Sequence, residues 1–137
     1  MKVLIFGGAG YVGYELVKCF LGNGDTVAIY DAFCNGDASA HDKVSALGSV
    51  TVFEGTIADK KAVRRAIEEF CPDVVYNLAA LHYIPYCIQH PDEVYETNYQ
   101  GLQNIIQVLR DYPQTKFIFA SSASVYGSPD QQCTLDT

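Results

Sequence analysis

The sequence predicts an α/β protein built on a doubly wound parallel β-sheet. Short apolar runs alternate with stretches whose apolar residues recur at helical spacing, and this alternation is typical of parallel strands joined by helices. Because such crossovers are right-handed, the expected strand order is 3-2-1-4-5. We expect a single domain over residues 1–137, since the chain shows no repeat, low-complexity tract or linker and is long enough to bury a core.

The first half of the chain is predicted to form three strands with a glycine-rich turn and a helix between the first two. Lys2–Phe6 is apolar and is predicted to be the first strand, and the apolar positions of Tyr11–Leu21 predict a helix that ends at Gly22-Asn23-Gly24. The second strand is expected over Thr26–Asp31. The polar stretch 34–49 is expected to be a loop with room for one helical turn, and a third strand follows at Val50–Phe53.

The second half continues the same alternation. Asp59 is expected to cap a helix that reaches Phe70, with its apolar residues spaced for one buried face. A fourth strand follows at Val74–Tyr76, and Pro91–Arg110 is predicted to be one long helix. Phe117–Ala120 is the predicted fifth strand.

Three glycines, Gly7, Gly10 and Gly13, follow the first strand and extend into the start of the first helix at the spacing of a dinucleotide-binding turn. The first permits the turn, the second permits close approach of a pyrophosphate, and the third permits close packing of the helix on the strand. Asp31 ends the second strand, eighteen residues after Gly13, where a carboxylate accepts from both hydroxyls of an adenosine ribose. The alternative interpretation is that the glycines only serve turns and Asp31 only caps a loop.

The same region predicts NAD(H) rather than NADP(H) as the cofactor. Asp31 would repel a 2′-phosphate, and the residues that follow it, Ala32, Phe33 and Cys34, include no arginine to receive one. Amide groups and the dipole at the start of the first helix would face the phosphates instead.

Composition narrows the classes of partner and compartment. The formal charge of −7 argues against nucleic acid or an acidic membrane as a partner, because both require a basic footprint. No apolar run approaches the length of a membrane span and no leader precedes the first strand, so we expect a cytoplasmic protein. The five cysteines are widely spaced without a C-x-x-C pair, which indicates reduced thiols and no metal site.

Five motifs occur in one order along the chain: GGAGYVG at 7–13, YDAFCNG at 30–36, NLAAL at 77–81, TNYQG at 97–101 and FASSASVYG at 119–127. Together they resemble the N-terminal part of the extended short-chain dehydrogenase/reductases, the NAD-dependent epimerase/dehydratase family, and are most similar to its nucleotide-sugar epimerases. The resemblance covers the whole chain. It implies a Rossmann-type fold that is truncated before the family's catalytic helix, and NAD as cofactor.

The resemblance also implies a set of cofactor-binding positions along the pyrophosphate, the adenosine ribose, the adenine and the nicotinamide. Thr56 stands where the family usually carries an aspartate, so its hydroxyl and the Ile57 backbone are expected to contact the adenine. His82 replaces a lysine that reaches the nicotinamide ribose in several epimerases, and it either hydrogen-bonds there or only covers the cleft. The full predicted set is Gly7, Gly10, Tyr11, Val12, Gly13, Asp31, Asn35, Gly36, Thr56, Ile57, Leu78, Ala79, Ala80, His82 and Asn98.

One catalytic residue is implied by the resemblance. Ser122 matches a serine or threonine that hydrogen-bonds the reacting hydroxyl, although a serine at a strand end also commonly satisfies nearby backbone groups. Its family partners, a tyrosine base and a lysine four residues later, lie beyond Thr137, and we expect no substitute pair upstream. Tyr126 matches a packing tyrosine, and Ala123 and Ser124 replace the acid pair of dehydratases.

The leading functional hypothesis is therefore the NAD(H)-binding portion of a nucleotide-sugar epimerase-like enzyme, which is inactive as this chain alone. The alternatives are a non-catalytic dinucleotide-binding module and one half of a split enzyme. A nucleotide sugar is the expected substrate of the complete enzyme. We also expect a homo-oligomer or a second chain, because the predicted long helix has more apolar positions than one buried stripe needs: Val94, Leu102, Ile105, Ile106, Val108 and Leu109.

Overall fold

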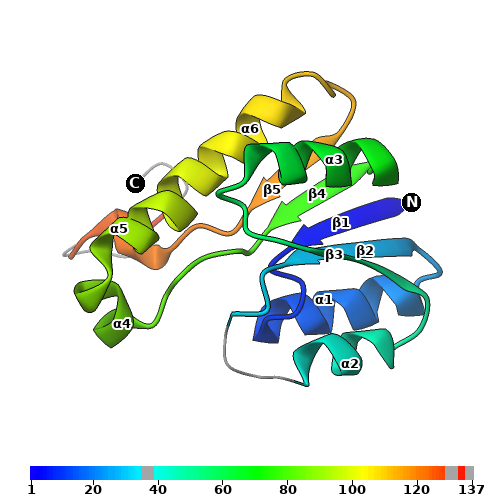
Figure 1. Cartoon of the computed structure of the whole chain (residues 1–137), viewed down its shortest axis with the longest axis horizontal. Coiled ribbons are helices and arrows are strands. Elements are labelled where there is room, and N and C mark those ends of the chain that lie inside the picture. The colour runs from blue at the N-terminus through cyan, green and yellow to red at the C-terminus, as the bar shows by residue number, and fades with distance from the viewer. Residues whose placement is uncertain (35–38, 129–132, 135–137) are drawn as a thin grey trace.

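A five-stranded parallel sheet is the centre of the structure (Figure 1). This computed structural model describes residues 1–34, 39–128 and 133–134. The sheet order is β3-β2-β1-β4-β5, which confirms the predicted order. The strands are β1 (Lys2–Phe6), β2 (Thr26–Asp31), β3 (Val50–Glu54), β4 (Val74–Asn77) and β5 (Lys116–Phe119).

Helices cover both faces of this sheet (Figure 1). α1 (Tyr11–Gly22) and α2 (Ala40–Ser45) lie on one face, and α3 (Lys60–Phe70) and α6 (Leu102–Leu109) lie on the other. α2 is the helical turn expected in the loop after β2. α3 begins as predicted, because the Asp59 carboxylate accepts hydrogen bonds from the amides of the next turn at 2.9 and 3.1 Å.

Alternate residues of the strands build two separate apolar cores. Leu4, Phe6 and Tyr30 point toward α3 and α6, where they pack with a cluster that includes Ile67 and Ile105. Their neighbours in the strands point the other way and pack against α1 and α2, as Val3, Ile5, Val27 and Ile29 do with Val17 and Val44. Burial on both faces explains why the central strands read as continuous apolar runs.

The prediction of one regular helix over Pro91–Arg110 is wrong. The chain forms a short helix α5 (Pro91–Val94), a π-helix η1 (Tyr95–Gly101) and then α6. A further helix, α4 (Ile84–Gln89), precedes them and was not predicted. Its exposed apolar residues show no single buried stripe, so periodicity gave no signal for it.

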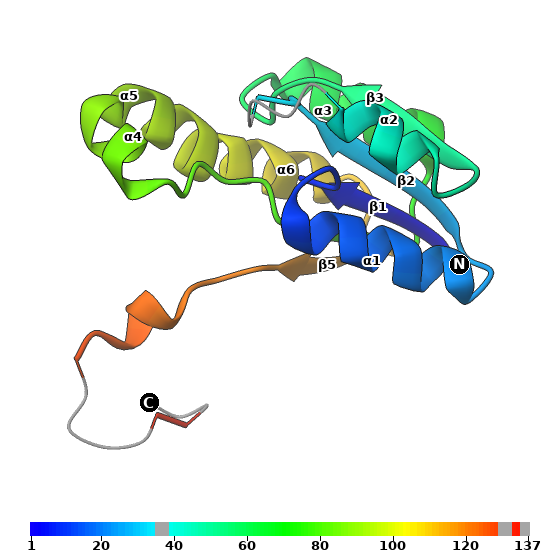
Figure 2. The same ribbon diagram turned by 90° about the horizontal axis from the view of Figure 1, so that it is seen from below.

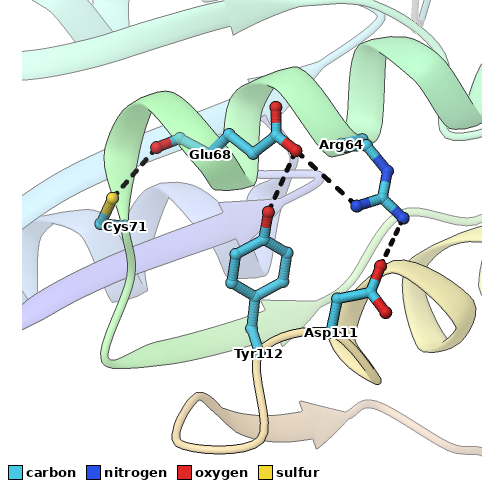
Figure 3. A network of polar contacts seen from close by, with 5 residues as sticks. All are labelled: Arg64, Glu68, Cys71, Asp111 and Tyr112. Atoms are coloured by element: carbon cyan, nitrogen blue, oxygen red, sulfur yellow. Dashed lines mark hydrogen bonds and ion pairs between the residues drawn. The ribbon is translucent and has the colours of Figure 1, made fainter.

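Polar contacts join the outer surfaces of α3 and the segment after α6 (Figure 3). Arg64 pairs with Asp111 at 2.7 Å, and the Tyr112 hydroxyl donates to the Glu68 carboxylate at 3.1 Å. The Cys71 thiol donates to the Glu68 carbonyl oxygen at 3.0 Å. These groups are exposed or half-buried at the surface, and surface pairs add little stability, so the burial of Ile105 and Val108 is the main force that holds α6 on the sheet.

The chain leaves the body of the fold after β5 (Figure 2). It forms a 3₁₀ turn, η2 (Ala123–Tyr126), in which no residue is buried, so the Tyr126 ring is not the packing residue that we expected. β5 is an edge strand, and its Ile118 and Phe119 side chains are 43% and 48% exposed. Ile105, Val108 and Leu109 are buried within the chain, so they are not available to a partner. No helix in the described residues is long and apolar enough to cross a membrane.

Substitution of Gly13 by alanine is expected to destabilise the fold. A Cβ on Gly13 would overlap the Gly7 carbonyl oxygen and lie 2.7 Å from the Gly8 Cα, and both neighbours are backbone that has little freedom to move. Overpacking of this kind costs about 1–3 kcal/mol of unfolding free energy, which urea unfolding will measure. The control is Gly22→Ala at the end of the same helix, where a Cβ meets no atom within 4 Å and stability should not fall. Equal losses in the two variants would contradict this account.

Candidate dinucleotide-binding site

A cavity of about 440 Å³ opens at the carboxyl ends of the central strands. It lies at the point in the sheet where β1 has β2 on one side and β4 on the other. This is the usual ligand position in open α/β sheets. Among its lining residues are twelve that were predicted to bind a cofactor: Gly7, Gly10, Tyr11, Val12, Gly13, Asp31, Thr56, Ile57, Leu78, Ala79, Ala80 and His82.

The glycine turn brings backbone to the floor of this cavity. Gly7 has a φ of +79°, and a Cβ there would lie 2.8 Å from the Ala79 nitrogen. The turn and the end of β4 therefore meet backbone to backbone. The Gly7 amide donates to the Tyr30 carbonyl oxygen of β2 at 2.8 Å, so the same residue touches both neighbouring strands.

The N-terminus of α1 presents free amides at the cavity. The Tyr14 amide bonds to the Gly10 carbonyl oxygen at 2.8 Å, and it is the first N–H that an α-helix beginning here can satisfy internally. The amides of Tyr11, Val12 and Gly13 have no intrahelical acceptor. The N-cap residue is Gly10, so no N-cap side chain accepts from them. Such a helix end favours an anion.

Asp31 lies at the end of β2 with its carboxylate held by two amides. Oδ2 accepts from the Ala9 N–H at 2.9 Å, and Oδ1 accepts from the Phe33 N–H at 2.9 Å. The side chain thus does cap the loop that follows, as the alternative interpretation expects. An ionised carboxylate has about four acceptor positions, so these two bonds orient Asp31 and leave capacity for further donors at the cavity.

The loop after β3 forms another wall. Thr56 and Ile57 line the cavity, and the Thr56 hydroxyl oxygen accepts from the Ala58 amide at 3.2 Å. Ile57 is only 4% exposed. The residues at 35 and 36, predicted to lie near the ribose, fall outside the described part of the chain.

Asn98 was predicted to bind the cofactor, but it does not line the cavity. Its amide oxygen accepts from the Leu81 N–H and its amide nitrogen donates to the Leu81 carbonyl oxygen, both at 2.8 Å. The side chain therefore holds the segment between β4 and α4, which contributes Leu78 to His82 to the cavity wall. Asn98 supports the wall from behind.

Seven lining residues were not predicted: Tyr30, Ala32, Cys34, Gly55, Leu81, Thr97 and Ala120. Most of them are direct neighbours of predicted residues at strand ends, so the strand assignment itself was the signal that could have found them. Thr97 is the first residue of the TNYQG motif at 97–101. Only its place in the folded helix shows that it reaches the cavity.

Ser122, the predicted catalytic residue, lies outside this cavity. It caps η2, where its Oγ accepts from the Ser124 N–H at 3.2 Å and lies 3.1 Å from the Ser124 hydroxyl. Ala120, two residues earlier, does line the cavity. The local bonding of Ser122 is the strand-end role considered as its alternative.

The expectation of no Tyr-x-x-x-Lys spacing upstream of Ser122 was wrong. The spacing occurs twice, as Tyr14–Lys18 and as Tyr112–Lys116. Neither tyrosine lines the cavity. The Lys18 ammonium bonds to Glu15 at 3.0 Å, and burial together with a hydrogen bond to Glu68 raises the pKa of Tyr112. These pairs do not supply a proton acceptor at the site.

Residues 3–137 match the NAD dependent epimerase/dehydratase family. This chain belongs to that family. It is 31% identical over 129 residues to a UDP-glucose 4-epimerase of Lactobacillus helveticus, covering 94% of this chain and 38% of the relative. A UDP-N-acetyl-alpha-D-glucosaminuronate decarboxylase of Bacillus cytotoxicus is 32% identical over 126 residues, covering 92% of this chain and 38% of the relative.

The fold is also similar to that of solved epimerases. The UDP-glucose 4-epimerase of Bifidobacterium longum, solved in complex with NAD⁺ and UDP, superposes with a TM-score of 0.86 at 28% identity and covers 96% of this chain and 40% of its own. This chain is thus homologous to the NAD-binding portion of UDP-glucose 4-epimerases, and it spans about two-fifths of the length of the proteins that it matches.

Removal of the Asn98 side chain is expected to destabilise the cavity wall. In Asn98→Ala both the amide and the carbonyl of Leu81 lose their partners, and because these groups are only part-buried the two losses together cost about 1–3 kcal/mol. Urea unfolding measures the loss. The control is Gln100→Ala in the same π-helix, because Gln100 is exposed. The interpretation fails if the two variants are equally stable.

Proposed function

We propose that this chain binds NAD in the cavity at the carboxyl ends of β1, β2 and β4. The observation that carries the proposal is the pairing of two features across one cavity. The open N-terminus of α1 suits a pyrophosphate, and the Asp31 carboxylate, oriented by the Ala9 and Phe33 amides, suits a ribose diol. A volume of about 440 Å³ lies within the usual range for small-molecule sites.

The remaining lining residues suit the two bases of a dinucleotide. Thr56 and Ile57 provide a polar edge for the adenine beside Asp31. The segment from Leu78 to His82 follows β4 on the other side of the glycine turn and would line the nicotinamide half. His82 is the one histidine among the lining residues, so it is the candidate donor to the nicotinamide ribose.

We further propose that residues 1–137 are one NAD-binding domain of a nucleotide-sugar epimerase-like enzyme. The bound cofactor would take up and return a hydride at a sugar carbon. Ser122 would orient the reacting hydroxyl after the segment that follows β5 is brought to the cavity. The proton acceptor must come from residues that this chain does not contain, because no Tyr-x-x-x-Lys follows Ser122.

Two alternatives keep the same binding site. In the first, the chain is a dinucleotide-binding module without catalysis, and in the second it is completed by another polypeptide. The exposed edge at Ile118 and Phe119 favours a neighbour of some kind, since apolar edge strands promote association. A homo-oligomer or a second chain therefore stays a proposal for this protein.

The chain is expected to bind NAD(H) in preference to NADP(H). Isothermal titration should show that Asp31→Asn weakens NAD binding by about tenfold, the effect of losing one charge-assisted hydrogen bond, and narrows the difference from NADP. Asp42→Ala, an exposed carboxylate on α2, is the control and should bind both cofactors as the unaltered chain does. Binding of NADP(H) at least as tight as that of NAD(H) to the unaltered chain would contradict the assignment.

The chain alone is expected to show no epimerase turnover. Ser122 lacks a proton acceptor, and removing the base from such an enzyme commonly costs several orders of magnitude in rate. The measurement is the interconversion of UDP-glucose and UDP-galactose by chromatography in the presence of NAD. Turnover that persists through purification would require a base among the tyrosines present here.

A further inference from the structure

The cavity wall formed by residues 55–58 is held in place by two side chains of other elements. The first is Tyr30 in β2, which is 2% exposed and whose hydroxyl donates to the Thr56 carbonyl oxygen at 2.9 Å. A Cβ on Gly55 would overlap this hydroxyl, so the glycine leaves the space through which Tyr30 reaches the loop. Burial raises the pKa of Tyr30 to about 12, and the phenol remains a donor at neutral pH.

The second side chain is Asn104 in α6. Its amide nitrogen donates to the carbonyl oxygens of Ile57 and Ala58, both at 3.0 Å. One turn earlier, Gly101 lets the helix approach the Ile57 side chain, because a Cβ there would lie 2.5 Å from the Ile57 Cγ1. The loop is therefore fixed to the helix through its backbone and through its apolar side chain.

These contacts determine which groups of the loop remain for a ligand. The Thr56 carbonyl oxygen accepts from Tyr30 and also from the Asp59 amide, the latter at 3.1 Å. Since the carbonyl and N–H of a trans peptide point in opposite directions, these two bonds turn the Ile57 N–H away from Tyr30. No acceptor for this N–H is present among the described residues. The Thr56 hydroxyl oxygen is fixed in turn by the Ala58 amide. The wall thus offers one amide donor and one hydroxyl.

We infer that Tyr30 and Asn104 are positioning residues that aim the Ile57 amide and the Thr56 hydroxyl at a 6-aminopurine. The inference rests on the proposed NAD site. Adenine presents an amino donor beside the ring acceptor N1, and these match a hydroxyl oxygen and an amide N–H. Hypoxanthine reverses both groups, since it has a carbonyl and a protonated N1. A correctly aimed wall therefore prefers adenine to hypoxanthine.

The test compares NAD with its hypoxanthine analogue by isothermal titration. Tyr30→Phe removes one hydroxyl, and Asn104→Leu removes the amide. Each variant is expected to weaken NAD binding by about fivefold to tenfold, the effect of losing one hydrogen bond between the loop and the adenine, and to bring the preference for NAD over the analogue close to one. Gln103→Leu is the control, because Gln103 neighbours Asn104 on α6 and its side chain makes no hydrogen bond in the described structure, and its preference should match that of the unaltered chain.

A merely structural role would weaken both ligands equally and leave the preference unchanged, and that result would overturn the inference. Amide hydrogen exchange of residues 57–59 is the second measurement, and it needs no ligand. Faster exchange confined to this loop in Tyr30→Phe is expected, and unchanged exchange would overturn the inference. If the unaltered chain binds no NAD, the proposed function fails while the exchange result still decides whether Tyr30 holds the loop. Asn104→Asp replaces Asn104→Leu if the latter does not fold.

Discussion

Close backbone contact at the glycine turn is the constraint on which the rest of the structure depends. Gly7 lies against the start of the segment after β4 and donates to the end of β2, while Gly13 packs its helix against the same turn. The ends of β1, β2 and β4 therefore meet in direct backbone contact at this turn. The cavity exists because no side chain occupies this junction, and its walls are the loops that leave these strands.

The sheet could be predicted from sequence because its signals are local and repeated. Each central strand is a short apolar run, and the glycine spacing joins the first strand to the first helix. Asp31 was predictable for the same reason, since it ends a strand at a known distance from the turn. Its bonds to Ala9 and Phe33 show that capping a loop and facing a ligand are compatible roles for one carboxylate.

The parts that sequence reasoning missed depend on contacts between distant segments. The sequence around Tyr30 gives no sign that its hydroxyl reaches Thr56. The sequence around Asn104 gives no sign that its amide donates to the Ile57 carbonyl oxygen, because these pairs meet only when α6 and β2 are packed. The π-helix was missed because its sequence, YETNYQG, carries no signal that separates a π-helical turn from an α-helical one. Asn98 was assigned to the cofactor from its match to a family asparagine, and that match gave no signal for its two bonds to the Leu81 backbone.

One helix supports two opposite walls of the cavity. Asn98 in η1 holds Leu81, and Asn104 in α6 holds the loop after β3. The two walls therefore share a support even though they belong to different strand ends. Loss of this helix from the sheet would open both halves of the cavity together.

The π-helix gives this shared support a particular sensitivity to the winding of the helix. A wide turn holds one more residue than an α-helical turn, so η1 sets the angular phase between the Asn98 part and the Asn104 part of the helix. If the same residues wound as a regular α-helix, the extra residue would rotate one part by about 100° relative to the other and turn Asn98 or Asn104 away from its wall. Deletion of that extra residue would instead close the wide turn and leave the phase of the two parts unchanged. The wide turn, rather than the length of the segment alone, therefore keeps both asparagines at their walls.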